Sequence, residues 1–198
     1  RNVLELEKIF LYLCYHDGGI LDVPALSREL EGISRQSVGN FLDLFEGTHL
    51  IYRLRQFGYG KEVLRGKWKV YLADPALPGA MLLFGRRLLE KPDRLAAAVE
   101  AAFFKHVFTR YYRQTPIFSY WRDKKNKDQE VDLIVESGDR IVPFEVKYQD
   151  AKPGQSKLKG LRLFLEEKGL TEGYAITRND SDFGVQTAIS ARRGSERL

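Results

Sequence analysis

Three charged residues interrupt two apolar segments of the chain, and their types suit phosphodiester hydrolysis. Asp132 lies in EVDLIVES, and Glu145 and Lys147 lie in RIVPFEVKY. Carboxylate oxygens are hard ligands that Mg²⁺ and Mn²⁺ prefer. A bound divalent ion acts as a Lewis acid and activates water, and a nearby ammonium group stabilises charge that develops on a phosphate. We therefore consider a metal site at Asp132 and Glu145 with Lys147 as the catalytic cation.

The two segments are typical of strands joined by a tight turn. Gly138-Asp139 between them suits a two-residue type II′ hairpin turn. In that register Asp132 lies opposite Glu145, and Glu130 lies opposite Lys147. Strict alternation puts these charges on one face and places on the other face Val131, Leu133 and Val135. The alternative is a solvated strand face with Glu130 and Lys147 as a surface ion pair.

Glu100 is a third carboxylate that helps to choose between these interpretations. It lies in a helix expected over RLAAAVEAAFFKHVFTRYY, where helical spacing puts it beside Phe103 and Phe104 on the stripe that must face a sheet. A glutamate there is partly buried and needs a partner. It forms either a structural ion pair with a lysine or part of the site with Asp132 and Glu145.

The elements that must position these residues fall into two groups. Residues 1–74 read as three helices, with Asp22 and Ser34 as caps of the second and third, followed by two strands. This is the order of a winged helix-turn-helix. Three prolines interrupt a junction, which we expect as a linker over 75–93. Residues 94–198 follow the order αβββαβ, so the predicted fold is α/β (α+β), a winged helix followed by a mixed-sheet domain.

The second group resembles the PD-(D/E)XK nuclease superfamily. Asp132 followed after a turn by Glu145-Val146-Lys147 is similar to its D…(D/E)xK motif, and the order αβββαβ is similar to its restriction-endonuclease-like core. The resemblance implies that Asp132, Glu145 and the Val146 carbonyl bind Mg²⁺ or Mn²⁺, and that Lys147 and Glu100 belong to the catalytic set. Val131 stands where the superfamily name implies a proline.

A closer likeness is to the C-terminal region of unknown function that follows an AAA-type ATPase domain in many bacterial and archaeal proteins. YWRDKKNKDQEVDLIVESGDRIVPFEVKY, SRQSVGNFLDLFEGTHLIYRL and KVYLADPAL carry this resemblance. It implies an ATPase domain as a partner in the same protein. The present sequence does not include that domain, because it has no G-x-x-x-x-G-K-[ST] loop. Arg1 stands where an initiator Met is expected, which favours a piece of a longer protein. A homo-oligomer is left open.

Nucleic acid is the partner that charge favours, since the net charge is +5 and the pI about 9.2. The candidate DNA contacts lie in the third helix, the following hairpin, the basic loop RDKKNK and the helix after Lys147. They are Arg35, Gln36, Asn40, Arg53, Arg55, Lys61, Arg65, Lys67, Lys124, Lys125, Lys127, Gln155 and Lys157. The alternatives are a winged helix that packs on the ATPase or a sister subunit, and a loop that is a solvated charge run.

We expect a Mg²⁺-dependent DNA endonuclease-like domain, or else a nuclease-fold module with little or no cleavage that serves DNA binding or assembly. A transcriptional regulator is a third interpretation, which leaves the hairpin charges unexplained. No apolar run approaches the length of a membrane span. One cysteine, Cys14, lies in an apolar helical pattern, which predicts a core position and suits a reducing cytoplasm. The three histidines lack ligand spacing, so zinc is not expected.

Overall fold

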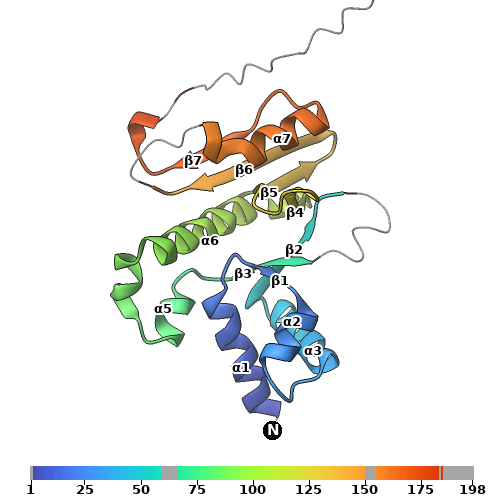
Figure 1. Ribbon diagram of the computed structural model, residues 1–198, viewed down its shortest axis with the longest axis vertical. Coiled ribbons are helices and arrows are strands. Elements are labelled where there is room, and N and C mark those ends of the chain that lie inside the picture. The colour runs from blue at the N-terminus through green and yellow to red at the C-terminus, as the bar shows by residue number, and fades with distance from the viewer. Residues whose placement is uncertain (1, 59–66, 150–154, 183, 185–198) are drawn as a thin grey trace, which may run out of the picture.

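The computed structural model describes residues 2–58, 67–149, 155–182 and 184, without the side chains of residues 155 and 156. Lys61, Arg65 and the Gln155 side chain, expected to contact DNA, therefore lie outside the described residues. The fold is a mixed α+β arrangement around one seven-stranded sheet (Figure 1). Its strand order is β1-β3-β2-β4-β5-β6-β7. No helix in the described ranges is long and apolar enough to cross a membrane.

The N-terminal elements follow the expected order with one short strand added. They are α1 (Asn2–Tyr15), β1 (Ile20–Leu21), α2 (Val23–Glu29), α3 (Arg35–Gly47), β2 (Ile51–Gln56) and β3 (Trp68–Leu72). The Asp22 carboxylate accepts from Ala25 N–H and the Ser34 hydroxyl accepts from Ser37 N–H, which confirms both predicted caps. The apolar faces of the three helices meet in a buried core that includes Cys14, as predicted.

The expected linker is partly helical. It contains α5 (Leu77–Met81) and a 3-10 helix, η1 (Gly85–Glu90), and α5 packs against α1. The prolines at 75 and 78 mark the start of α5, where a missing backbone N–H costs nothing because no helical acceptor precedes it. Residues 75–93 are thus the connection between β3 and the next long helix, and a fair part of it is folded.

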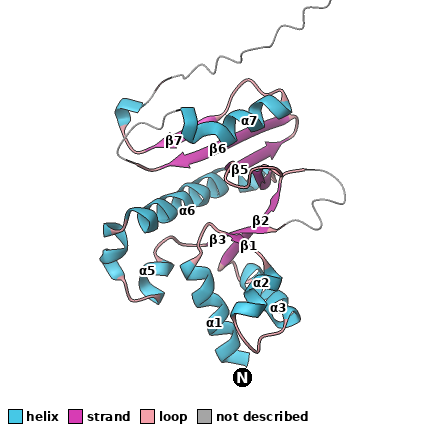
Figure 2. Ribbon diagram, in the orientation of Figure 1, coloured by secondary structure: helices cyan, strands magenta, loops and turns pink. Residues whose placement is uncertain are grey.

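The C-terminal elements occur in the expected order αβββαβ. They are α6 (Pro92–Tyr111), η2 (Tyr112–Gln114), β4 (Ile117–Arg122), β5 (Glu130–Ser137), β6 (Arg140–Lys147), η3 (Gln155–Leu158), α7 (Lys159–Lys168), β7 (Tyr174–Thr177) and η4 (Asp180–Asp182). Strands β4, β5 and β6 form an antiparallel meander, and β7 joins β6 in parallel (Figure 2).

One sheet runs through both groups of elements. Strand β2 pairs in parallel with β4, with Arg55 opposite Ser119 and Gln56 opposite Tyr120. The hairpin of β2 and β3 therefore lies beside the C-terminal meander (Figure 1). The division into domains at 75–93 stays a prediction, but backbone pairing crosses it, so side chains of β3 reach the C-terminal elements.

The hairpin register confirms the predicted turn. Ser137 pairs with Arg140, Gly138 has a φ of 57°, and Asp139 is not among the described residues with positive φ. This pattern is that of a type II′ turn, whose first central residue needs a φ that glycine adopts without strain. The ladder between β5 and β6 extends from the turn to Leu133 opposite Phe144.

A bulge in β5 overturns the predicted division of faces. On β4, Ser119 pairs with Ile134 and Trp121 with Val131, so Asp132 and Leu133 together lie opposite one residue. Leu133 and Val135 pack in the cluster that contains Phe104 of α6, whereas Val131 and Ile134 pack in the cluster that contains Phe164 of α7. Helices α6 and α7 thus cover opposite faces, and Asp132 shares the α6 face with Leu133. Strict alternation fails because the bulge adds one residue.

Candidate functional site

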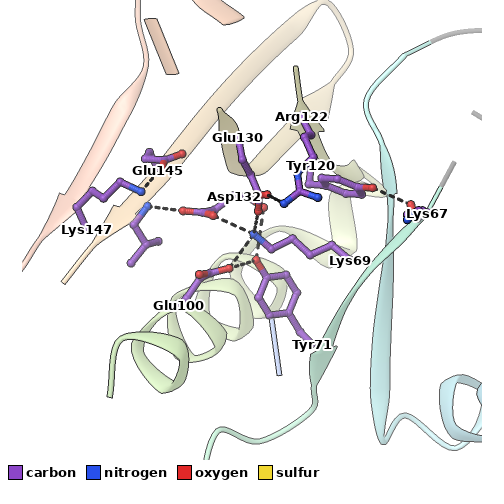
Figure 3. A network of polar contacts seen from close by, with 11 residues as sticks. Lys67, Lys69, Tyr71, Glu100, Tyr120, Arg122, Glu130, Asp132, Glu145 and Lys147 are labelled. Atoms are coloured by element: carbon purple, nitrogen blue, oxygen red, sulfur yellow. Dashed lines mark hydrogen bonds and ion pairs between the residues drawn. The ribbon is translucent and has the colours of Figure 1, made fainter. Parts of the chain in front are cut away.

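A buried lysine of β3 that is not among the candidate site residues of the sequence analysis lies at the centre of the carboxylates. Lys69 Nζ lies 2.8 Å from Glu100 Oε1, 2.9 Å from Glu130 Oε1 and 2.9 Å from Asp132 Oδ1 (Figure 3). Its side chain is fully buried. An ammonium group has three N–H donors, so the three carboxylates use all of its hydrogen-bonding capacity.

Strand alternation explains why Lys69 points there. Val70 and Leu72 face the core formed by α1, α2 and α3, so the alternating residues Lys69 and Tyr71 face the C-terminal elements. The Tyr71 ring stacks on Phe104 of α6 with a centroid separation of 4.6 Å. Its hydroxyl donates to Glu100 Oε1 at 2.7 Å. Alternation along KWKVYL places Lys69 and Tyr71 on the same face of the strand, so this signal is present in the sequence. The basic composition of the hairpin suggested DNA contacts instead.

Asp132 is tied to both neighbouring parts of the sheet. Its Oδ1 accepts from Lys69 on β3, and its Oδ2 accepts from the Val146 backbone N–H on β6 at 2.8 Å. Burial raises its pKa, but the Lys69 charge and these hydrogen bonds outweigh burial, so the pKa lies below the usual value. Asp132 is therefore an ionised carboxylate with both oxygens occupied.

Glu145 and Lys147 form a second pair beside Asp132. The Lys147 ammonium contacts Glu145 Oε1, whereas Glu145 Oε2 is buried and has no hydrogen-bond partner among the described residues. Burial and the Asp132 charge raise the pKa of Glu145 to about 8, although Lys147 acts in the opposite direction. Glu145 is only 4% exposed. It is thus the least satisfied acidic group of the cluster.

The predicted pairing of Glu130 with Lys147 is wrong. Glu130 turns toward β3 and β4, where Oε1 contacts Lys69 and Oε2 lies 3.2 Å from Arg122 Nη2. Lys147 contacts Glu145 on its own strand instead. The difference follows from the end of the β5–β6 ladder at Leu133, because beyond it the two strands no longer hold their side chains in register.

The charges in this buried region are close to balance. Four carboxylates, from Glu100, Glu130, Asp132 and Glu145, meet three cations, from Lys69, Arg122 and Lys147. Burial lowers the pKa of Lys69, but the carboxylates of Asp132 and Glu100 raise it more, so this pKa lies well above its usual value. Burial and the Asp132 charge raise the pKa of Glu100, although Lys69 and Tyr71 act in the opposite direction. Protonation of one carboxyl would leave equal numbers of positive and negative charges.

Comparisons with known proteins divide the chain at the junction. Residues 95–193 match the family described as Domain of unknown function (DUF4143), and residues 1–88 match a second family described as Domain of unknown function (DUF8612). The chain belongs to the DUF4143 family. Domains of this family are often found at the C-terminus of AAA-ATPase-like proteins. Comparisons with curated proteins and with solved structures found no match.

The DUF4143 segment supplies the carboxylates but not the central cation. Glu100, Glu130, Asp132 and Glu145 lie within residues 95–193, whereas Lys69 and Tyr71 lie within the DUF8612 match. The cluster is therefore assembled from both matched segments. The DUF4143 segment does not contain Lys69, and Lys69 reaches the carboxylates through the pairing of β2 with β4.

The donor set of the DUF4143 segment fits a divalent ion in type but not in its present arrangement. Hard carboxylate oxygens and the orphaned Glu145 Oε2 are ligands that Mg²⁺ accepts. Lys69 Nζ, however, occupies the space between Glu100 and Asp132. Within the part of the chain that the structure describes, no three acidic, His or Cys side chains are arranged as a metal site.

The expected DNA contacts of the N-terminal part differ in how they are held. Arg53 is bound by Asp43 and Glu46 of α3, and Lys67 by Asp22. Gln36 donates to Asn40, which occupies two polar groups on the exposed face of α3. Arg35 is exposed, as is Arg55, whose guanidinium lies over the Trp68 ring.

The remaining described candidates lie near the cluster in sequence. Lys124, Lys125 and Lys127 are exposed on the loop between β4 and β5, which starts directly after Arg122. Lys157 Nζ donates to Gln149 Oε1 at 2.9 Å. The loop lysines are thus an exposed basic group beside the Glu130–Arg122 pair, and Lys157 is engaged in a local contact.

Proposed function

We propose that this chain is the C-terminal module of an AAA-type ATPase, with a winged helix-turn-helix followed by a restriction-endonuclease-like domain, and that the module binds DNA without hydrolysing it. The observation that carries the proposal is Lys69 Nζ between Glu100, Glu130 and Asp132. A fully buried ammonium group thus binds Asp132, one of the two carboxylates that the resemblance to nucleases assigns to a metal ion.

Geometry and charge both oppose a metal beside Lys69. Mg²⁺ holds oxygen ligands at about 2.0–2.1 Å in an octahedral arrangement, and Lys69 already fills the space between the oxygens of Glu100 and Asp132. A divalent ion about 4 Å from an ammonium group would be repelled by roughly 8 kcal/mol at an effective dielectric constant of 20. The cluster in this arrangement is a structural unit whose charges are close to balance.

The loop between β4 and β5 supplies a surface for DNA. Lys124, Lys125 and Lys127 are exposed there, and the chain carries a net charge of +5. Clustered cations bind phosphates without reading sequence, and each phosphate contact steepens the salt dependence of binding. The third helix contributes less, because Arg35 is the cation that it exposes.

Fluorescence anisotropy with labelled duplex, single-stranded and branched DNA tests the proposal, with intact substrate checked on gels in Mg²⁺ and in Mn²⁺. We expect binding without cleavage, and binding about tenfold or more weaker when Lys124, Lys125 and Lys127 are all changed to Glu. The matched control changes three exposed cations elsewhere, Lys8, Arg110 and Arg113, to Glu.

Three outcomes count against the proposal. Cleavage by the unaltered chain that disappears in Asp132→Ala and Lys147→Ala overturns it in favour of hydrolysis. No binding to any of the DNAs, or equal loss in the test and control triple variants, removes the DNA role and favours a module for assembly with the ATPase.

A Mg²⁺-dependent DNA endonuclease is the second candidate, and Glu145 favours it. Its Oε2 is buried without a hydrogen-bond partner in the described residues, and its carboxylate, which lies near Lys147 and Asp132, is an oxygen donor of the type that Mg²⁺ binds. Asp132 and Glu145 would hold the ion, which would supply Lewis acidity, and Lys147 would lie beside the reacting phosphate. Retention of plasmid cleavage in Asp132→Ala would exclude this assignment of the site.

A further inference from the structure

We propose that Lys69 is an internal substitute for a divalent cation, and that the two compete for the carboxylates of Asp132 and Glu100. Removal of the Lys69 ammonium would then create a Mg²⁺ or Mn²⁺ site in this chain. The inference rests on the nuclease-like arrangement proposed above and deepens it, because it explains how an intact set of acidic residues is kept from metal.

The contacts of Lys69 define the space that a metal would enter. Its Nζ is within 2.9 Å of oxygens from α6 and from two positions of β5 (Figure 3). These three oxygens surround one cation at hydrogen-bonding distance, and although they are not spaced as a metal site in the described residues, they are of the type that a hard cation binds. Truncation of the Lys69 side chain leaves these oxygens and a net negative charge that a small cation relieves.

Glu145 is a further acidic side chain in this region, and one of its buried oxygens is unsatisfied within the part of the chain that the structure describes. It is 4% exposed, and its Oε2 has no partner among the described residues. The Asp132 carboxylate lies close enough for its charge to act on Glu145, and Asp132 itself contacts Lys69. Glu145 therefore offers a further carboxylate oxygen next to Asp132, on strand β6, which pairs with β7.

The cation and the oxygens belong to different matched segments. Lys69 lies on β3 in residues 1–88, and the carboxylates lie in residues 95–193. Strand β3 contacts the C-terminal part through Lys69 and through Tyr71, which donates to Glu100, and just before β3 the Lys67 carbonyl accepts from Tyr120. The position of the β2–β3 hairpin relative to β5 therefore decides whether the ammonium is present in the cluster.

Mn²⁺ binding to the purified chain tests this inference without reference to activity. Titrations followed by electron paramagnetic resonance compare the unaltered chain with Lys69→Met and with Lys69→Arg, which keeps the charge. We expect Lys69→Met to bind one Mn²⁺ about tenfold or more tightly than either of the others. Adding Asp132→Asn to Lys69→Met should abolish the gain.

Thermal unfolding supplies a second readout. A metal that binds the folded state raises the midpoint, so millimolar Mn²⁺ should raise that of Lys69→Met by about 5 °C and leave the unaltered chain nearly unchanged. If Lys69→Met is unfolded without metal, Lys69→Met/Glu130→Gln leaves less negative charge behind and keeps Asp132, Glu145 and Glu100.

Three results would overturn the inference. The first is equal Mn²⁺ affinity of the unaltered chain and folded Lys69→Met, and the second is no Mn²⁺ binding by folded Lys69→Met. The third is that Lys69→Met and Lys69→Met/Glu130→Gln are both unfolded and Mn²⁺ restores the fold of neither. DNA cleavage by the unaltered chain would instead overturn the proposed function, and the ratio of Mn²⁺ affinities would still decide the role of Lys69.

Discussion

Lys69 Nζ donates a hydrogen bond to Asp132 Oδ1 at 2.9 Å across 63 residues of sequence. The contact joins β3 of the N-terminal hairpin to a carboxylate on β5 of the C-terminal elements, and both side chains are almost completely buried. Burial of two opposite charges is tolerated because each has further partners, Glu100 and Glu130 for Lys69 and the Val146 N–H for Asp132.

We predict that Lys69→Met destabilises the chain by about 3–5 kcal/mol, because removal of one member of a buried ionic network leaves uncompensated charge. Urea unfolding at neutral pH in EDTA measures the loss. Lys67→Met is the control, since Lys67 pairs with Asp22 at the surface with 55% of its side chain exposed, and we expect a loss below about 1 kcal/mol.

A double-mutant cycle refines this prediction. Asp132→Asn should cost less in the Lys69→Met background than in the unaltered chain, because the carboxylate has then lost its main cation. Additive losses would contradict the direct pairing of Lys69 with Asp132.

We predict that Tyr71→Phe is more harmful than Tyr120→Phe. Each change removes one hydroxyl group that donates a hydrogen bond. The acceptor is the Glu100 carboxylate for Tyr71 and the Lys67 carbonyl for Tyr120. A hydrogen bond to a charged group contributes about 1.5–3 kcal/mol and a neutral one about 1 kcal/mol. Chemical denaturation of the two variants measures the difference, and equal losses would show that the Glu100 contact has no special weight.

We predict that Gly160→Ala destabilises the chain by about 2 kcal/mol or more, as expected for a contact that forces a backbone shift. A Cβ at Gly160 in α7 would lie 2.2 Å from the Glu130 carbonyl oxygen and 2.6 Å from its nitrogen. The helix would have to move away from β5. Gly39→Ala in α3 meets nothing within 4 Å and should be neutral or stabilising by up to about 1 kcal/mol. Thermal midpoints of the two variants check the contrast.

We predict a pH-dependent gain of stability in Asp17→Asn. Burial raises the pKa of Asp17 to about 7, although the Leu72 N–H donates to its carboxylate. The folded state therefore keeps a proton that the unfolded chain releases near pH 4, so the free energy of unfolding falls as pH rises from about 4 to 7 and this loss is complete above pH 7.

Urea unfolding at pH 5 and pH 8 measures this effect. Asp17→Asn keeps an oxygen that can accept from the Leu72 N–H, and its side chain cannot ionise. The difference between the variant and the unaltered chain should therefore grow in favour of the variant by on the order of 2 kcal/mol from pH 5 to pH 8. Parallel pH profiles would contradict the raised pKa.

Local signals in the sequence were sufficient for the elements and for the candidate acids. Ser34 and Asp22 cap helices because their side chains bond to the nearest free N–H groups, and Gly138-Asp139 sets the hairpin register because few residues adopt that turn. Helical periodicity placed Glu100 on the covered side of α6, and the lysine ion pair considered for it is present.

The tertiary structure decided which groups meet. The bulge at Asp132 and Leu133 depends on how β4 and β5 pair, so no alternation rule within β5 reveals it. Lys69 reaches the acids only because β2 pairs with β4, an association of strands separated by the whole of α6. Turns and caps depend on neighbours in sequence, whereas the partners of a buried carboxylate depend on long-range packing. The sequence by itself identified the acidic residues, and only the tertiary structure placed Lys69 among Glu100, Glu130 and Asp132.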